Sequence, residues 1–347
     1  MLVPGISMKN TRETNDAAGD FDSRIRDFQR DWNNTLEQVA GVIVGHKKVS
    51  SQVLACLLAG GHGLIEGVPG IGKTLIVRTL ADALNLEFKR IQFTPDLMPA
   101  DITGTDIVDV SDNGTRSFHF HKGPIFSNLV LADEINRATP KTQSAVLEAM
   151  QEGTVTMSGQ TYRLPAPLLV LATQNPIEME GTYPLPEAQL DRFMLKIVVD
   201  SPHVDDLVEI FNRTTGKQAP CPEQTADAER IQEMKDLVRQ VPVPSHVTDY
   251  VARLVDATHP ERDSSPEFVN KFVRFGASPR GGQAAILIAK VCALADGRPN
   301  VSFEDVQNAM LPCMQHRIIM NFEGQTEGYT GRRVIEEVLA SIPRTRD

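Results

Sequence analysis

The residues best suited to chemistry in this 347-residue chain lie in one glycine-rich segment, GVPGIGKT, from Gly67 to Thr74. It fits the phosphate-loop pattern G-x-x-x-x-G-K-[ST] at every position. Its glycines allow a backbone path whose N–H groups converge on phosphate oxygens, and the helix that follows adds its N-terminal partial positive charge. Lys73 would meet the outer phosphates as a point charge, and Thr74 would offer a hydroxyl to Mg²⁺. HGLIEG before the segment reads as a buried strand and TLIVRTLADAL after it as a helix, so a chance glycine-rich turn is disfavoured.

Two acids follow the next apolar run, LVLADE, which ends at Asp133 and Glu134. A buried strand that ends in Asp places a carboxylate at the carboxyl edge of a parallel sheet, where ligands bind in open α/β folds. Asp133 would hold Mg²⁺ through water, and Glu134 would orient and deprotonate the attacking water. The alternative is that both acids only start the next helix, where acids favour the dipole. The phosphate loop upstream favours the catalytic interpretation.

Two later apolar runs carry further polar candidates. LLVLATQNP ends at Asn175, which could bond the γ-phosphate or the attacking water, although Asn-Pro also starts turns and a structural role stays open. LDRFMLKIVVD reads as a fourth strand preceded by Arg192, a position far along the sheet from the phosphate loop in most such topologies. Arg192 is therefore a candidate for a neighbouring subunit's phosphate, with an ion pair to Asp191 or Glu187 as the alternative. In ASPRGG, Arg280 stands at the start of a helix.

The elements that must position these residues divide the chain into three parts. Residues 1–22 are polar and predicted to be a disordered leader. Residues 23–202 alternate short apolar strands with helices, which indicates an α/β domain with a parallel sheet. Residues 203–347 show helical periodicity, which indicates a helical second domain. Buried helix faces are predicted at Leu207, Ile210 and Phe211, at Ile231, Met234, Leu237 and Val238, at Val247, Tyr250, Val251 and Leu254, and at Ala284, Ile286, Leu287 and Val291.

Two β-hairpins are predicted inside the first domain. Asn113-Gly114 lies between alternating segments, and Ser158-Gly159 lies between a second pair. They could be packing elements, with Phe118 and Phe120 as ordinary core residues.

Composition excludes several classes of protein. Hydrophobic residues make up 41% and charged residues 23%, as in an ordinary globular protein. The N-terminus lacks a signal pattern and no apolar run reaches the ~18 residues of a transmembrane helix, so we expect a cytoplasmic protein without membrane insertion. A net charge of −10 disfavours nucleic acid as the main partner. The four cysteines contain no CxxC pair, which argues against a disulfide framework or zinc site, and they are Cys56, Cys221, Cys292 and Cys313.

Taken in order, GVPGIGKT, LADEINRATPKTQSAVLEAMQEG, ATQNPIEMEGTYPLPEAQLDRF and GASPRG resemble the MoxR family of AAA+ ATPases. The similarity runs from about Phe28 through the second domain and does not cover the leader. It implies an AAA+ P-loop NTPase fold, with a parallel sheet flanked by helices and a C-terminal all-α lid domain. It also implies that both hairpins project toward a pore or a partner.

The resemblance also implies roles for individual residues. Lys73 and Thr74 correspond to Walker A, and Asp133 and Glu134 to Walker B. Asn175 corresponds to sensor 1, Arg192 to the arginine finger and Arg280 to sensor 2. VIVGH matches the segment where AAA+ proteins contact adenine. The residues expected to hold the nucleotide are Val44, Gly45, Gly67, Val68, Pro69, Gly70, Ile71, Gly72, Lys73, Thr74 and Leu75, with Thr74 and Asp133 on Mg²⁺.

The function that the resemblance implies is ATP hydrolysis with Mg²⁺ by a homo-oligomer, a hexameric ring, that remodels or matures a protein client. A partner with a von Willebrand factor A domain, and metal or cofactor insertion, belong to the same expectation. The alternative is a helicase-type motor or nucleic-acid translocase, against which the acidic charge counts. A small-molecule kinase gives no reason for Arg192, Arg280 and a helical lid together, and Glu134 argues against a scaffold that does not hydrolyse.

Overall fold

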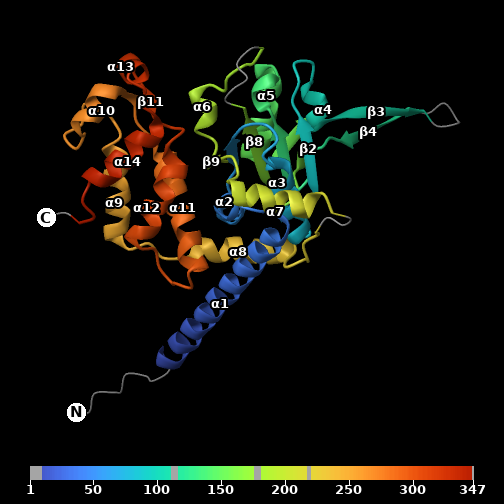
Figure 1. Cartoon of the computed structure of the whole chain (residues 1–347). Helices are drawn as coiled ribbons and strands as arrows, with labels where there is room; N and C mark the ends of the chain where they lie inside the picture. Colours follow the sequence, from blue (N-terminus) through green and yellow to red (C-terminus); the bar gives the residue numbers. More distant parts are fainter. Residues whose placement is uncertain (1–9, 111–115, 176–180, 217–219, 346–347) are drawn as a thin grey trace, which may run out of the picture.

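A five-stranded parallel sheet forms the centre of the first domain, and the helical second domain stands beside it (Figure 1). The computed structural model describes residues 10–110, 116–175, 181–216 and 220–345, so the predicted Asn113-Gly114 turn and most of the first half of the leader lie outside the described residues. In spatial order the strands are β2 (Phe88–Gln92), β5 (Leu129–Asp133), β8 (Leu169–Gln174), β1 (Gly63–Glu66) and β9 (Leu195–Val198). All four neighbouring pairs are parallel, as predicted.

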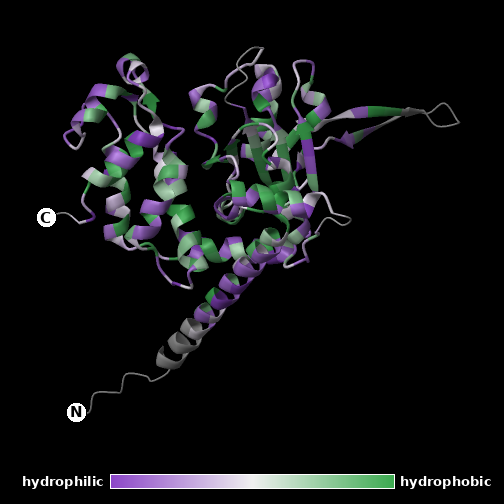
Figure 2. Ribbon diagram, viewed as in Figure 1, coloured by the Kyte–Doolittle hydropathy of each residue, from purple (hydrophilic) through white to green (hydrophobic). Residues whose placement is uncertain are grey.

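Helices cover both faces of this sheet. In chain order they are α1 (Asn10–Val42), α2 (Lys47–Ala59), α3 (Lys73–Ala83), α4 (Pro99–Thr103), the 3₁₀ turn η1 (Ile135–Arg137), α5 (Pro140–Glu152) and α6 (Glu187–Leu190). Covered on both faces, β5 is buried along its whole length and β8 as far as Thr173, which explains their unbroken apolar runs. Figure 2 shows the sheet interior as hydrophobic.

Helix α1 extends into the segment that composition predicts to be disordered. It begins at Asn10 and leads away from the body of the molecule (Figure 1). Ile25, Phe28 and Val39 are buried on the side that faces the body, and they anchor the helix there. The polar sequence before them therefore continues a helix whose stability comes from packing further along the chain.

The second domain is helical apart from one small ladder. Its helices are α7 (Val204–Thr214), α8 (Ala228–Gln240), α9 (Ser245–Asp256), α10 (Glu267–Phe272), α11 (Pro279–Ala295), α12 (Phe303–Met314), α13 (Phe322–Thr326) and α14 (Gly331–Ser341). Strands β10 (Val273–Phe275) and β11 (Ile319–Met320) pair antiparallel, which the all-α expectation missed because such short segments give no periodicity. Within the described ranges, no helix combines the length and apolarity needed to cross a bilayer.

The predicted buried faces hold for α8 and α9, whose named residues are all buried. On α11, Ala284 and Val291 are buried while Ile286 and Leu287 are partly buried against the same core. The prediction is wrong for α7, none of whose residues is buried. Leu207 and Ile210 are half-buried and Phe211 is 58% exposed. The periodicity of α7 reflects an apolar face that lines a cavity and not one that packs into the core.

Two antiparallel hairpins leave the first domain. They are β3 (Gly104–Val110) with β4 (Arg116–Lys122), which projects outward (Figure 1), and β6 (Thr154–Met157) with β7 (Gln160–Arg163). Positive φ angles at Ser158 and Gly159 make the predicted two-residue turn.

The two hairpins also contact each other. The Ser158 hydroxyl donates to the Asp106 carboxylate, and the rings of Phe120 and Tyr162 stack with centroids 4.3 Å apart. Phe120 is therefore a packing residue between the hairpins, whereas the side chain of Phe118 lies outside the described residues.

Candidate nucleotide-binding site

The phosphate loop connects β1 to α3 and takes a backbone path that needs glycine. Gly70 and Gly72 have φ angles of +82° and +85°, in the left-handed region that favours glycine. A Cβ at Gly67 would lie 2.8 Å from the carbonyl oxygen of Val199. Glycine is thus required here for two different reasons, one conformational and one steric.

Lys73 lies inside the curve of this loop. Its Nζ donates to the carbonyl oxygen of Gly67 at 2.6 Å and to that of Val68 at 3.2 Å. Partial burial lowers the pKa of the Lys73 ammonium, while the nearby charges of Asp133 and Glu134 raise it. The ammonium is therefore held in the loop by weak acceptors that the oxygens of a charged phosphate would outcompete.

Asp133, the last residue of β5, is a buried carboxylate with both oxygens engaged. Thr173 Oγ1 donates to Oδ1 at 2.5 Å. Arg90 Nε donates to Oδ2 at 2.9 Å, and a second guanidinium nitrogen lies 2.7 Å from the same atom. These contacts fix the orientation of the carboxylate at the tip of the sheet.

Glu134 adopts a left-handed backbone conformation, with φ +57° and ψ +50°. Non-glycine residues take this conformation rarely, and such strain gathers at functional sites. Its N–H donates to Thr173 Oγ1 at 2.8 Å. Its Oε2 accepts from Gln92 Nε2 and from an Arg137 guanidinium nitrogen, both at 3.0 Å. The carboxylate is therefore held beside that of Asp133 by side chains from β2 and from η1.

The sheet topology brings three parts of the predicted site together. Strand β8 lies between β1 and β5, with Gln174 in register with Glu66. The loop after β1, Asn175 after β8 and Asp133 at the end of β5 therefore share one carboxyl edge. Asn175 is 6% exposed and lies between the other two.

A cavity of about 450 Å³ opens beside the phosphate loop. Val44 contributes to its wall, so the segment predicted to contact adenine faces the same space as the loop. Leu75, 47% exposed, and the apolar face of α7 add a largely apolar lining. The lining residues are Val42, Ile43, Val44, His46, Pro69, Gly70, Ile71, Gly72, Leu75, Ile76, Pro202, Leu207, Ile210, Phe211, Arg213 and Thr214. A flat apolar base would fit this lining, with its phosphates directed toward the loop.

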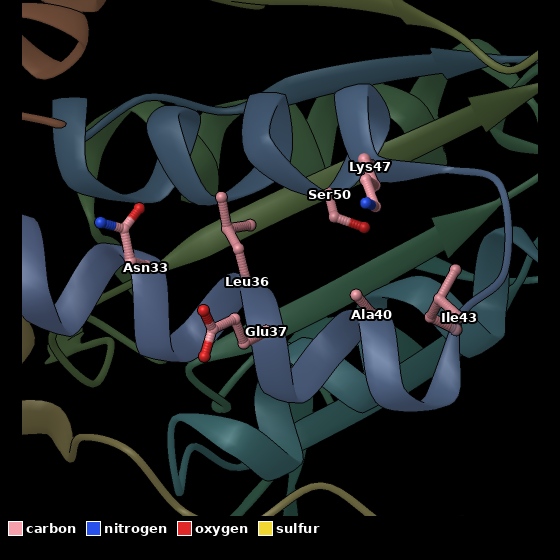
Figure 3. Close-up of a pocket in the computed structure, with 7 residues that line it drawn as sticks. All are labelled: Asn33, Leu36, Glu37, Ala40, Ile43, Lys47 and Ser50. Atoms are coloured by element: carbon pink, nitrogen blue, oxygen red, sulfur yellow. The ribbon is translucent and has the colours of Figure 1, made fainter. Parts of the chain in front are cut away.

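A smaller cavity, of about 200 Å³, lies between α1 and the start of α2 (Figure 3). Its lining residues are Asn33, Leu36, Glu37, Ala40, Ile43, Lys47 and Ser50. None of the residues predicted to hold a nucleotide is among them, although Ile43 lines both cavities.

Arg192 and Arg280, the two predicted arginines, do not lie with the residues at the carboxyl edge of the sheet. Strand β9 runs parallel to β1, so Arg192, which precedes β9, belongs to the amino edge of the sheet. The four-residue strand alone separates the two edges by about 13 Å. Arg280, near the start of α11, has a guanidinium nitrogen 3.7 Å from Asp191 Oδ2. Among the described residues no ion pair joins Arg192 to Asp191 or Glu187, and Asp191 pairs with Arg280 and with Arg317.

Sequence reasoning did not find Arg90, Gln92, Thr173 and Arg137, the residues that hold the two acids. Arg90 and Gln92 alternate on the exposed side of β2, a signal that any solvated edge strand would give. Their role follows only from the pairing of β2 with β5, where Gln92 is in register with Asp133.

Comparison with known proteins agrees with this geometry. Residues 62–195 match the model of the ATPase family associated with various cellular activities (AAA), and residues 267–338 match that of the AAA lid domain. Chaperone MoxR1 of Mycobacterium tuberculosis is 42% identical over 315 residues, which cover 89% of this chain and 82% of that protein. The chain belongs to the MoxR family of AAA+ ATPases. Protein MoxR of Paracoccus denitrificans is 29% identical over 344 residues, covering 93% and 99% of the two chains.

Two further likenesses extend over nearly the whole chain. YeaC of Bacillus subtilis, a protein of uncharacterized function, is 39% identical over 313 residues, which cover 88% of this chain and 92% of YeaC. The crystal structure of a protein from Cytophaga hutchinsonii superposes with a TM-score of 0.88 at 38% identity, over 96% of this chain and 99% of that one. The predicted family and fold class are thereby confirmed.

Proposed function

We propose that this MoxR-family protein binds ATP in the cavity beside the phosphate loop and hydrolyses it. The observation that carries the proposal is the gathering of Lys73, Thr74, Asp133, Glu134 and Asn175 at one edge of the sheet, next to that cavity. Lys73 binds the outer phosphates, Glu134 takes the proton of the attacking water, and Asn175 orients the water or the γ-phosphate. Val44 and Gly45 contact the base.

The donor chemistry beside the loop fits Mg²⁺. The Thr74 hydroxyl, in the first turn of α3, and the Asp133 carboxylate are the hard oxygen ligands that this ion prefers. When bound, the ion would neutralise charge that develops on the phosphates. Arg90 and Thr173 fix the orientation of the Asp133 carboxylate.

Asp133→Ala is expected to weaken nucleotide binding and to abolish hydrolysis, because only Thr74 would remain as a protein contact to the ion. Phosphate release measured over a titration of MgCl₂ checks this, with Asp82→Ala, an exposed acid on α3, as the matched control. Hydrolysis that persists in excess EDTA would remove the metal from the proposal.

We further propose that the hydrolytic site is completed by Arg192 of a neighbouring subunit in a ring. Arg192 lies at the sheet edge opposite its own phosphate loop and is partly exposed. Its planar, permanently charged guanidinium suits the charge that develops on a transferring phosphoryl group. A ring in which one subunit's amino edge faces the next subunit's carboxyl edge would satisfy this placement.

Arg192→Ala should bind ATP nearly as the wild type does and lower kcat by about 10³-fold. Wild-type specific activity should rise with protein concentration as rings assemble. Mixing Arg192→Ala with Glu134→Gln should restore turnover, since a mixed interface pairs an intact Glu134 with a neighbour's intact Arg192. Full activity of a wild-type monomer, together with no rescue in the mixture, would rule out the shared site.

The work done by hydrolysis is proposed to be remodelling or maturation of a client protein, in line with the chaperone name of the MoxR1 relative. The projecting hairpin supports this, because Ile107 and Val108 of β3 are 38% and 44% exposed and offer apolar contact away from the body. A von Willebrand factor A domain partner and metal or cofactor insertion are part of the same proposal.

Remodelling would be supported if Glu134→Gln retains a client protein in the presence of ATP and a chain that also carries Lys73→Ala does not retain it. ATPase stimulation by single- or double-stranded nucleic acid, with no trapped protein, would contradict it.

A further inference from the structure

Arg317, which follows α12, is a buried charge where the helical lid domain meets the first domain. Its side chain is 3% exposed. Nε donates to Asp191 Oδ1 at 2.9 Å, and one terminal nitrogen donates to the carbonyl oxygens of Asp191 at 3.0 Å and Phe193 at 2.7 Å. The other terminal nitrogen donates to the carbonyl oxygens of Met194 at 3.4 Å and Cys313. All five N–H donors of the guanidinium are thus in use, and four of the acceptors belong to residues 191–194.

The two residues before Arg317 bind the same stretch of chain. Gln315 Nε2 donates to the carbonyl oxygen of Lys196 at 2.9 Å, and His316 Nε2 to that of Phe193 at 2.9 Å. Burial, together with the positive charge of Arg317, lowers the pKa of His316 to about 3, so the ring is neutral with its proton on Nε2. Residues 315–317 therefore hold the backbone that leads into β9.

Asp191 extends this contact to the start of α11. Its Oδ1 accepts from Ser278 Oγ at 2.6 Å as well as from Arg317, and its Oδ2 faces Arg280. Ser278 is the residue before α11, so two separate parts of the lid meet at one carboxylate. A Cβ at Gly281 would lie 3.1 Å from Arg317 Cδ, so the absence of a side chain there leaves room for the arginine stem.

Arg192 stands in the middle of the segment that these contacts hold. Its neighbours on both sides, Asp191 and Phe193, have their carbonyl oxygens bound by Arg317. From these contacts we infer that Arg317 is a positioning residue, which fixes the backbone from which Arg192 reaches the nucleotide of the neighbouring subunit. The inference rests on the shared site proposed above.

The same contacts have a second consequence. Arg280 on the lid pairs with Asp191, the residue before Arg192, and Arg317 binds the backbone on both sides of Arg192, so a shift of the lid would displace both Arg280 and Arg192. An arginine holds this backbone segment better than a lysine would, because a planar guanidinium binds several acceptors in one fixed geometry whereas an ammonium is flexible. Displacement of a reacting group by about 1 Å can cost about 100-fold in rate.

Arg317→Lys keeps the positive charge and removes the planar guanidinium. We expect kcat to fall by about 10- to 100-fold while KM for ATP stays within about threefold of wild type. The matched control is Arg298→Lys, because Arg298 also pairs with a buried acid, Asp305, but both residues lie within the lid. The control should retain wild-type kcat.

A mixing experiment separates positioning from a general structural role. Arg317→Lys mixed with Glu134→Gln should regain turnover, since the Glu134→Gln chain supplies a well-placed Arg192 to an intact Glu134. Arg317→Lys mixed with Arg192→Ala should not, since no interface then holds a well-placed arginine. Loss of rescue with Glu134→Gln, or a wild-type kcat for Arg317→Lys, would overturn the inference.

Failure of this inference is distinguishable from failure of the shared site. If Arg192→Ala and Glu134→Gln do not rescue each other, the shared site is wrong, whereas if they do and Arg317→Lys is not rescued, only the positioning role is wrong. If Arg317→Lys does not fold, Asp191→Asn tests the positioning role of Arg317. This substitution keeps the shape of the Asp191 side chain and removes the charge that pairs with Arg317. It should also lower kcat and be rescued by Glu134→Gln, and wild-type kcat or failed rescue would overturn the inference.

Discussion

Replacing Glu134 with Gln is expected to keep ATP affinity within about threefold of wild type and to lower kcat by about 10²- to 10⁴-fold. The amide cannot accept the proton of the attacking water. Its oxygen can still accept from Gln92 and Arg137, the donors that hold the carboxylate now. The left-handed backbone at Glu134 should therefore survive the substitution, and the loss should fall on the chemical step alone.

Phosphate release at saturating ATP, alongside equilibrium binding of the nucleotide, measures the two effects separately. Glu148→Gln is the matched control, because it makes the same chemical change at an exposed position on α5. A kcat close to wild type in Glu134→Gln would mean that another group accepts the proton, and the assignment of Glu134 would fail.

Lys73→Ala is expected to have the opposite effect from Glu134→Gln, because the loss should be in ATP affinity. A hydrogen bond to a charged group contributes about 1.5–3 kcal/mol, which corresponds to an increase in Kd of about 10- to 100-fold. The ammonium already lies in the loop on the carbonyl oxygens of Gly67 and Val68, so little rearrangement is needed for it to meet phosphate. Removing it leaves the loop amides as the main remaining contact.

Titration of ATP followed by calorimetry checks this result. Lys48→Ala is the control, since Lys48 is exposed near the start of α2 but does not line the cavity. Equal ATP affinity in wild type and Lys73→Ala, with the control unchanged, would contradict the assignment of the phosphate loop.

The chemistry at the carboxyl edge of the sheet could be predicted from sequence because each part of it is local. Glycine spacing, the lysine beside it and the acids at the end of an apolar run are all read within a few residues. Parallel strands then bring their carboxyl ends to one edge without any knowledge of side-chain packing, which is why Lys73, Asp133 and Asn175 were found together.

What holds these residues could not be predicted, because the contacts cross large sequence separations. Arg90 meets Asp133 only because β2 pairs with β5, and Arg317 meets Asp191 only because the lid folds back on the core. Periodicity also shows that a helix face is apolar without showing what covers it. On α7 that ambiguity led to a wrong prediction, since Leu207 and Ile210 line the cavity.

Phosphate release by the purified chain tests most directly whether the residues at this one edge of the sheet hydrolyse ATP. We expect steady release with ATP and Mg²⁺, none above background in excess EDTA, and near-background release by Glu134→Gln at ATP concentrations that saturate its binding. Release by Glu134→Gln at the wild-type rate, or release that EDTA leaves unchanged, would contradict it.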